Sequence, residues 1–239
     1  MNHGLTRLRD GFPLSLRVIK EIHEILLSRG RGSEKQTGEF RRSQNWIGGT
    51  GPGNAGYVPP PPDQVLPCMG QLEAFLHEDR PDLPVLVKAA LAHLQFKSIH
   101  PFLDGNGRLG RLLITFLLCA QGVIRDPILY LSLYFKTHRA TYYELLDRVR
   151  QTGEWEVWLE FFLQGVRETA DQAAGAARRI VALFETYQKP IATLGRPATS
   201  ALRVFTHMQR SPIVSIPAAA RHTGMSAPAC SSTTNTWPS

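Results

Sequence analysis

The segment from Gly107 to Gln121 constrains the fold more than any other part of the chain, because a helix of this sequence is apolar on nearly every side. Its longest apolar run, from Leu112 to Ala120, is well short of the roughly 20 residues that a membrane span needs. A helix that is apolar all round in a water-soluble protein belongs in the core. We therefore expect a globular domain built around this helix, which should end at Gly122.

Elsewhere, apolar residues recur at intervals of three and four, which is typical of amphipathic helices. The stretch from Leu83 to Ser98 places Ala90 and His93 on one such face, so His93 is interpreted as a core histidine with a hydrogen-bond partner, and His23 likewise. Further helices are predicted over residues 13–27, 63–76, 137–150, 155–164 and 169–187. The fold class is therefore predicted to be all-α, a helical bundle.

Residues 38–58 differ from the rest, because glycines alternate there with aromatic and β-branched residues. This pattern predicts two short strands around the loop Gly48–Gly56, a small β-hairpin. Pro59–Pro62 should end it as a rigid extended spacer.

The C-terminal part resembles the beginning of a helix-turn-helix. Residues 190–196 are interpreted as a linker, followed by helices over 200–209 and from Ser215, with Gly224 and Ser226 as the next turn and N-cap. The last residues, 230–239, are polar and have no helical periodicity. We predict one domain over residues 1–190 and a linker with an incomplete winged-helix-like segment over residues 191–239.

Charge and cysteine content limit the function classes. The net charge of +7 suits an anionic partner such as a nucleotide, a nucleic acid or an acidic protein, although solubility alone also accounts for it. Cys68, Cys119 and Cys230 lack metal-site spacing and cannot all pair, which favours free thiols in a reducing compartment. The N-terminus has no apolar core of a signal peptide, so a cytoplasmic location without a membrane anchor is expected.

The segment from His100 to Arg111 carries the candidate chemistry. Gly105, Asn106 and Gly107 can adopt positive φ, so their backbone N–H groups can converge on one point. The apolar helix begins directly afterwards, and its positive end would face the same point. These features predict a phosphate-binding site.

The flanking side chains extend this site. Arg108 and Arg111 are three residues apart, hence on one helix face, and can bind further phosphates. Asp104 offers a hard oxygen suited to Mg²⁺, and His100 has the chemistry of a general base near neutral pH. The alternative is a polar turn with two solvated arginines. The combination of a histidine, an acid, Gly-Asn-Gly and two in-phase arginines within twelve residues favours an active site.

These twelve residues match in full the signature His-x-Phe-x-Asp/Glu-Gly-Asn-Gly-Arg-x-x-Arg, so the chain resembles the Fic family. The resemblance covers about residues 10–190, including a flap hairpin at Gly38–Pro62 and central helices at Leu83–Gly122. It implies a Fic-type bundle and an enzyme, a protein adenylyltransferase. Such an enzyme transfers AMP from Mg²⁺-bound ATP to a Ser, Thr or Tyr hydroxyl of a target protein.

The resemblance also assigns roles. It implies His100 as the base that takes the hydroxyl proton, Asp104 as the Mg²⁺ ligand, and Asn106 as a contact to the α-phosphate. Phe102 would anchor the loop in the core. The residues implied in nucleotide binding are Asp104, Gly105, Asn106, Gly107, Arg108, Gly110, Arg111, Tyr142 and Tyr143. For the tyrosine pair, ordinary core packing is the alternative.

The resemblance also assigns roles to the flap and to Arg150. Trp46, Ile47 and Gly48 correspond to the flap that pairs with the main chain of the target, the alternative being a mobile surface hairpin. Arg150 corresponds to a position near the purine in some relatives. The target protein and the oligomeric state stay open.

The chain departs from the family pattern, so alternative functions stay open. No inhibitory Ser/Thr-x-x-x-Glu-Gly/Asn segment is found, since Thr152–Glu156 is followed by Val157 and lies downstream. We expect the chain to be shortened at both ends, by truncation or by a change of reading frame. The alternatives are transfer of phosphocholine, UMP or phosphate, a nucleotide-sensing DNA-binding regulator, and an inactive fragment. Gly107 stands where the phosphate-transferring branch has lysine, and the incomplete C-terminal segment makes DNA binding unlikely.

Overall fold

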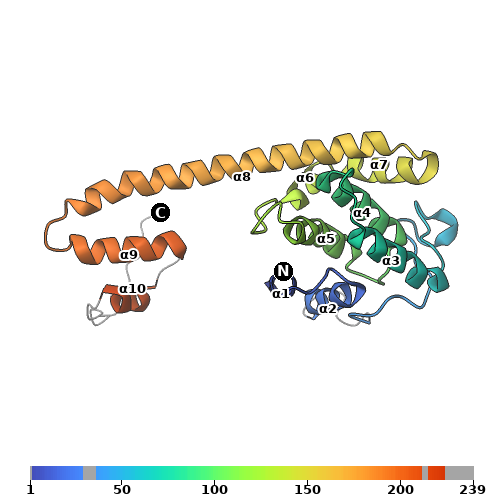
Figure 1. Ribbon diagram of the computed structural model, residues 1–239, viewed down its shortest axis with the longest axis horizontal. Helices are drawn as coiled ribbons and strands as arrows, with labels where there is room; N and C mark the ends of the chain where they lie inside the picture. Colours follow the sequence, from blue (N-terminus) through green and yellow to red (C-terminus); the bar gives the residue numbers. More distant parts are fainter. Residues whose placement is uncertain (1, 29–35, 212–214, 224–239) are drawn as a thin grey trace, which may run out of the picture. The chain divides into compact units, whose positions relative to one another are not determined.

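The structure, a computed structural model, describes residues 2–28, 36–211 and 215–223. The chain divides into two compact units, residues 1–173 and 174–239. Its helices are, in chain order, α1 (Asn2–Arg9), α2 (Leu16–Leu27), the short 3₁₀ helix η1 (Pro52–Asn54), α3 (Pro62–His77), α4 (Val85–Ile99), α5 (Asn106–Ala120), α6 (Leu131–Thr137), α7 (Arg139–Thr152), α8 (Trp155–Ala192), α9 (Ala198–Arg210) and α10 (Ile216–Thr223) (Figure 1). Within the described ranges, no helix is both long and apolar enough to cross a bilayer.

Helices α4 and α5 form the centre of the first unit and pack against each other, and α3 also packs against α4 (Figure 1). The expected core helix is confirmed, because Leu109, Leu113 and Leu117 of α5 are each only 2% exposed. Gly110 allows the close approach of the two helices, since a Cβ there would lie 3.1 Å from Phe96 Cδ1. A larger side chain at this position would push α5 away from α4.

Helix α5 ends as the sequence predicts. Gly122 has a φ of 68° and follows the C-cap residue Gln121. The amide of Gly122 donates to the Cys119 carbonyl at 3.1 Å, and the amide of Val123 donates to Leu118 at 2.9 Å. This pair of hydrogen bonds is the Schellman arrangement, in which a left-handed glycine satisfies the last carbonyls of the helix.

A cluster of aromatic rings from α6, α7 and α8 packs together in this core. Phe135, Tyr142, Trp158 and Phe162 are all buried, and their ring centroids lie 4.9–6.3 Å apart in the contacting pairs. The indole N–H of Trp158 donates to the Ala90 carbonyl at 3.1 Å, which joins α8 to α4. Full burial of each such ring contributes about 1.5–3 kcal/mol.

The predicted hairpin at residues 38–58, here called the flap segment, is smaller than expected. In the described chain it contains a single antiparallel bridge, in which Ile47 and Tyr57 exchange backbone hydrogen bonds of 2.9 and 3.1 Å. The two predicted strands are therefore wrong in extent. Gly48 and Gly49 adopt positive φ directly after the bridge, and η1 follows, so the backbone leaves the extended conformation before a second pair can form.

Three helices differ from the sequence-based expectation. Residues 155–192 form the one continuous helix α8 rather than two helices and a linker. The helix continues through Gly165, which is buried and where a Cβ would lie 2.5 Å from Tyr134 Cδ1, so this glycine serves close packing and does not end the helix. Pro190 lies within the last turn of α8. Helices α1 and α6 are not predicted from the sequence; both are short, which weakens any periodicity.

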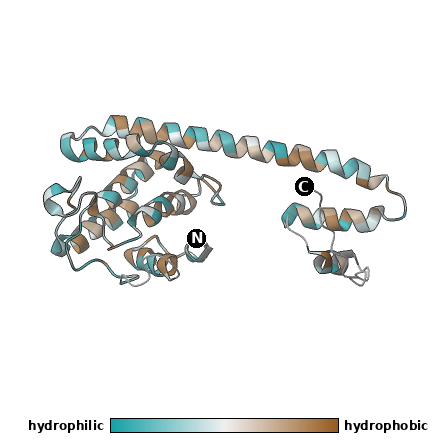
Figure 2. Cartoon of the chain, turned by 180° about the vertical axis from the view of Figure 1, so that it is seen from behind, coloured by the Kyte–Doolittle hydropathy of each residue, from teal (hydrophilic) through white to brown (hydrophobic). Residues whose placement is uncertain are grey.

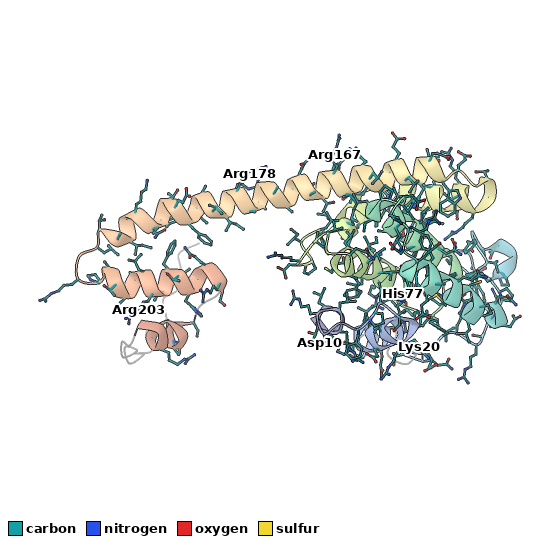
Figure 3. The ribbon with its side chains drawn as sticks, in the orientation of Figure 1. Asp10, Lys20, His77, Arg167, Arg178 and Arg203 are labelled. Atoms are coloured by element: carbon teal, nitrogen blue, oxygen red, sulfur yellow. The ribbon has the colours of Figure 1, made fainter. Side chains whose placement is uncertain are left out.

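In the second unit, the C-terminal part of α8 packs on α9 through an edge-to-face contact of Phe184 and Phe205, with centroids 5.9 Å apart. Helices α9 and α10 contact each other, as a partial helix-turn-helix requires. Hydrophobic and hydrophilic residues both occur along α8 (Figure 2), and Arg178 is exposed on it (Figure 3).

Several expectations fall outside the described residues, among them Gly224, Ser226, Cys230 and the polar end over residues 230–239. Cys68 and Cys119 are free thiols.

The division between the two compact units falls inside α8, between residues 173 and 174, whereas the sequence predicts the domain boundary between residues 190 and 191. That functional boundary stays a prediction.

Candidate active site

A cavity of about 550 Å³ lies between the end of α4, the loop after it, the start of α5, the flap segment and α7. It is lined by Trp46, Ile47, Gly48, Lys97, His100, Leu103, Asp104, Gly105, Asn106, Gly107, Arg108, Arg111 and Tyr143. The structure thus brings together the predicted site residues except Gly110, Tyr142 and Arg150. It also adds Lys97 and Leu103.

The loop from His100 to Gly105 is held by left-handed residues at both ends. His100 ends α4 with a φ of 50°, and its amide donates to Phe96 at 3.0 Å. Gly105 precedes α5 with a φ of 79°, and a Cβ on it would lie 3.2 Å from His23 Nε2. Glycine is therefore required there both by backbone conformation and by space.

The side chain of Asn106 closes this loop from inside. It is 2% exposed. Its Oδ1 accepts a hydrogen bond from the Phe102 amide at 2.9 Å, and its Nδ2 donates to the Phe102 carbonyl at 2.6 Å. Most of the hydrogen-bonding capacity of Asn106 is thereby used to shape the loop.

Phe102 is fully buried, as expected, and stacks on His23 with ring centroids 3.7 Å apart. His23 is itself buried and bonded, as expected. Its Nδ1 accepts from the Gly38 amide at 2.9 Å, so Nε2 carries the proton and donates to the Asp104 carbonyl at 3.0 Å. His23 thus ties the loop that carries Asp104 to α2 and to the start of the flap segment.

His100 is held in its neutral form. Burial, together with the positive charges of Lys97, Arg41 and Arg150, lowers the pKa of His100 from 6.5 to about 3. Its Nδ1 is buried and has no hydrogen-bond partner in the described part of the chain. Nε2 is therefore the ring nitrogen that can take a proton from a group in the cavity.

Asp104 supplies the acidic oxygens of the cavity. Its Oδ1 accepts the Gly105 amide at 2.6 Å, which fixes the carboxylate beside the start of α5. Within the described residues, no three His, Cys, Asp or Glu side chains are grouped as a metal site. One carboxylate suits Mg²⁺, which keeps several waters and takes further oxygens from bound phosphates.

Positively charged groups line the rest of the cavity. Arg108, Arg111 and Lys97 all line the cavity near the start of α5, whose first backbone N–H groups have no partner within the helix. Guanidinium groups, an ammonium group and a helix N-terminus together favour a polyanion. The cavity can therefore hold a nucleotide polyphosphate between a neutral base and a carboxylate.

Comparison with known proteins agrees with this chemistry. The sequence profile of the Fic/DOC family matches residues 13–118, which include α2 to α5 and the whole loop between α4 and α5. Residues 13–118 therefore form a Fic/DOC domain. That stretch contains all the cavity-lining residues except Tyr143.

Two curated relatives of this chain carry the same name. The chain is 32% identical over 209 residues to the "Protein adenylyltransferase Fic" of Aedes aegypti, a match that covers 81% of this chain and 39% of the relative. The protein of the same name from Culex quinquefasciatus is 33% identical over 159 residues, covering 66% of this chain and 29% of that protein. The chain thus spans less than half the length of these relatives.

Solved Fic structures share the fold. A Fic family protein from Desulfovibrio desulfuricans G20 has a TM-score of 0.64 at 21% identity, covering 94% of this chain and 61% of that one. Fic-1 (residues 134–508) from C. elegans has a TM-score of 0.57 at 22% identity, covering 74% of this chain and 49% of its own. The helical Fic fold is therefore confirmed.

Two of the predicted nucleotide-binding residues, Gly110 and Tyr142, do not line the cavity. Tyr142 is 4% exposed, and its hydroxyl bonds to His93 Nε2 at 2.9 Å in the aromatic cluster. His93 in turn donates from Nδ1 to the Gly110 carbonyl at 2.8 Å, which confirms it as a core histidine. Tyr143, one position on and about 100° round the helix, lines the cavity instead.

Arg41 is a residue of the Fic domain that sequence reasoning missed. It is 2% exposed and donates from Nε to the His100 carbonyl at 3.0 Å and from Nη1 to the Ser43 carbonyl at 3.3 Å. Its Nη2 donates to the Pro60 carbonyl. Arg41 thus fastens both ends of the flap segment to the end of α4. Since its partners are backbone carbonyls, no spacing rule could have identified them.

Arg150 also acts on the flap segment. Its guanidinium lies 3.8 Å from the ring centroid of Tyr57 and donates to Ser98 Oγ at 3.1 Å and to Asp147 at 2.8 Å. The Tyr57 hydroxyl donates to the Ser98 carbonyl at 2.9 Å. These contacts hold the Tyr57 side of the bridge on α4, and Arg150 does not line the cavity.

Proposed function

We propose that this chain is a protein adenylyltransferase, which transfers AMP from Mg²⁺-bound ATP to a Ser, Thr or Tyr hydroxyl of a target protein. The observation that carries the proposal is the placement of a neutral histidine, a carboxylate and three cations around one cavity at the start of α5. The names of the Aedes and Culex relatives support the group transferred.

In this proposal the phosphates lie over the first turn of α5. Backbone N–H groups at Asn106 and Gly107 and the side chains of Arg108 and Arg111 bind them, since all of these residues line the cavity. Asn106 acts mainly by holding the loop in shape through Phe102. Of the tyrosine pair, Tyr143 would contact the nucleoside, because it lines the cavity and Tyr142 does not.

Asp104 would hold the magnesium ion, and its carboxylate at the cavity wall fits a hard cation with few protein ligands. Bound Mg²⁺ would neutralise charge on the phosphates. His23 supports this role of Asp104, because its hydrogen bond to the Asp104 carbonyl fixes the backbone that carries the carboxylate.

The reaction then proceeds by displacement at the α-phosphorus. The target hydroxyl oxygen forms a bond to this phosphorus, the bond to the oxygen bridging to the β-phosphorus breaks, and pyrophosphate leaves. His100 Nε2 takes the hydroxyl proton. Its low pKa keeps it unprotonated before the substrate binds, and the negative phosphates would raise that pKa as they arrive.

The flap segment would position the target chain. In the bridge, both backbone groups of Ile47 are used by Tyr57, so those of the neighbouring Trp46 point to the other side. An added strand of the target would pair there. Gly48 has a φ of 72°, so the pairing edge would end at Ile47, and the exposed Trp46 ring would contact the target.

The experiment compares ATP labelled at the α-phosphate with ATP labelled at the γ-phosphate. The purified chain is incubated with each label and Mg²⁺, and protein-bound label is measured on the chain itself and on candidate targets. The proposal predicts transfer of the α-label only. Transfer of the γ-label would indicate a phosphotransferase, and label from UTP or CDP-choline in preference to ATP would indicate another transferred group.

A further inference from the structure

Lys97 lies on α4 one turn before His100 and is not part of the twelve-residue signature. The residue is only 5% exposed, yet it lines the cavity. In the described part of the chain its ammonium group makes no hydrogen bond or ion pair. The aromatic contact that it does make is with Tyr143, whose ring centroid is 6.0 Å from Nζ. An almost buried cation thus points into the cavity without a counter-charge.

The ammonium group of Lys97 converges with a second cation on the space beside Gly107. A Cβ on Gly107 would lie 3.5 Å from Arg111 Nη1 and 3.9 Å from Lys97 Nζ. Gly107 belongs to the first turn of α5, where backbone N–H groups are also unpaired. Two side-chain cations and a helix N-terminus therefore surround the space beside Gly107, which is empty because glycine has no side chain.

This arrangement is electrostatically unfavourable without a ligand. Burial, together with the nearby Arg150 and Arg111, lowers the pKa of Lys97 from 10.5 to about 8. The group still carries its charge at neutral pH. A buried cation among other cations is costly when it is unpaired, and an arriving anion removes that cost.

We propose that Lys97 binds a phosphate oxygen of the nucleotide beside Gly107, together with Arg111. The inference rests on the proposed function and adds a nucleotide-binding residue to it. An amino group at this place is a donor only, so it recognises the charged phosphates and makes no demand on the base. Binding should therefore depend on Lys97 for a nucleoside triphosphate and not for the nucleoside.

The test measures affinity for α,β-methylene-ATP, in which the bond broken by transfer is replaced, and for adenosine, both with Mg²⁺ and by calorimetry. Lys97→Met should weaken binding of the triphosphate about ten- to a hundredfold and leave adenosine binding unchanged. Lys97→Arg should restore most of the loss. The control is Lys136→Met, which removes the same charge from an exposed position on α6.

Thermal unfolding without ligand separates this role from a structural one. Lys97→Met removes an unpaired buried charge, so its midpoint should be equal to or above that of the parent chain. A clear fall in the midpoint, or an equal loss of adenosine and triphosphate binding, would assign Lys97 to packing or to the base and overturn the inference.

Equal triphosphate affinity in the parent and in Lys97→Met would overturn the inference while leaving the proposed function intact. Failure of the parent chain to bind α,β-methylene-ATP at all would reject the proposed function, and this inference with it. Gly107→Ala gives an independent check. Its Cβ makes only ordinary contacts and alanine favours the helix, but it fills the space for the phosphate. Triphosphate binding should fall without loss of stability.

Discussion

Two buried histidines of the first unit should make its stability depend steeply on pH. Burial lowers the pKa of His93 and of His100 from 6.5 to about 3 in each case. Such a group is neutral in the folded chain, whereas it binds a proton in the unfolded chain as the pH falls below about 6.5. The unfolded state then holds more protons, so the free energy of unfolding decreases with falling pH.

The magnitude follows from these values. At about pH 5 each histidine lowers the free energy of unfolding by about 2 kcal/mol relative to neutral pH, so the pair lowers it by about 4 kcal/mol. His23, whose pKa burial also lowers, acts in the same direction. This loss is a large fraction of a typical domain stability of about 5–15 kcal/mol. The carboxyl groups mostly titrate below this range.

The assay is urea unfolding at several pH values between about 7.5 and 5, followed by tryptophan fluorescence, since the buried Trp158 reports on the first unit. His93→Gln keeps a donor and an acceptor at this position but removes the titration. It should lower overall stability and reduce the pH-dependent loss by about 2 kcal/mol. His77→Gln, at an exposed position on α3, is the control (Figure 3). An identical pH dependence in the parent and His93→Gln would show that His93 does not cause the loss of stability at low pH.

Three further substitutions test the loop and the cavity. Asn106→Ala leaves both backbone groups of Phe102 without their partners and should lower the free energy of unfolding by about 2–4 kcal/mol in urea titrations; a change under about 1 kcal/mol would contradict the role of Asn106 in closing the loop. His23→Ala should raise the Mg²⁺ concentration needed for half-maximal transfer, because the Asp104 carbonyl loses its donor; an unchanged Mg²⁺ requirement would argue against this support. Arg111→Ala should weaken ATP binding about ten- to a hundredfold in calorimetry, since no described carboxylate pairs with Arg111; parental affinity would show that the phosphates lie elsewhere.

The central helices and the active-site loop could be predicted from the sequence because their signals are local. The observed α5 begins and ends within one residue of the predicted bounds, since the apolar run and Gly122 define it. The positions of His100, Asp104 and the arginines followed from spacing along a loop and one helix turn.

Other features depend on the tertiary structure and left no local signal. Arg41 acts through backbone carbonyls distant in sequence, and Lys97 becomes notable only because α5 and Arg111 lie beside it. Tyr142 and Tyr143 are adjacent, so a pattern could place both near the nucleoside, whereas the phase of α7 turns only Tyr143 to the cavity. The hairpin predicted around Ile47 is longer than the single bridge observed, because a glycine-rich sequence fits both a hairpin and an irregular loop.

The claim that His100 is the base in a nucleotide cavity is tested most directly by measuring transfer and binding on one preparation of His100→Ala. If His100 is the base, label from the α-phosphate of ATP should appear on protein about 10²–10⁴-fold more slowly than in the parent chain. Calorimetry should give nearly the parental affinity for ATP, because the phosphate-binding groups are intact. Transfer at the parental rate by this variant, with ATP still bound, would show that His100 is not the base.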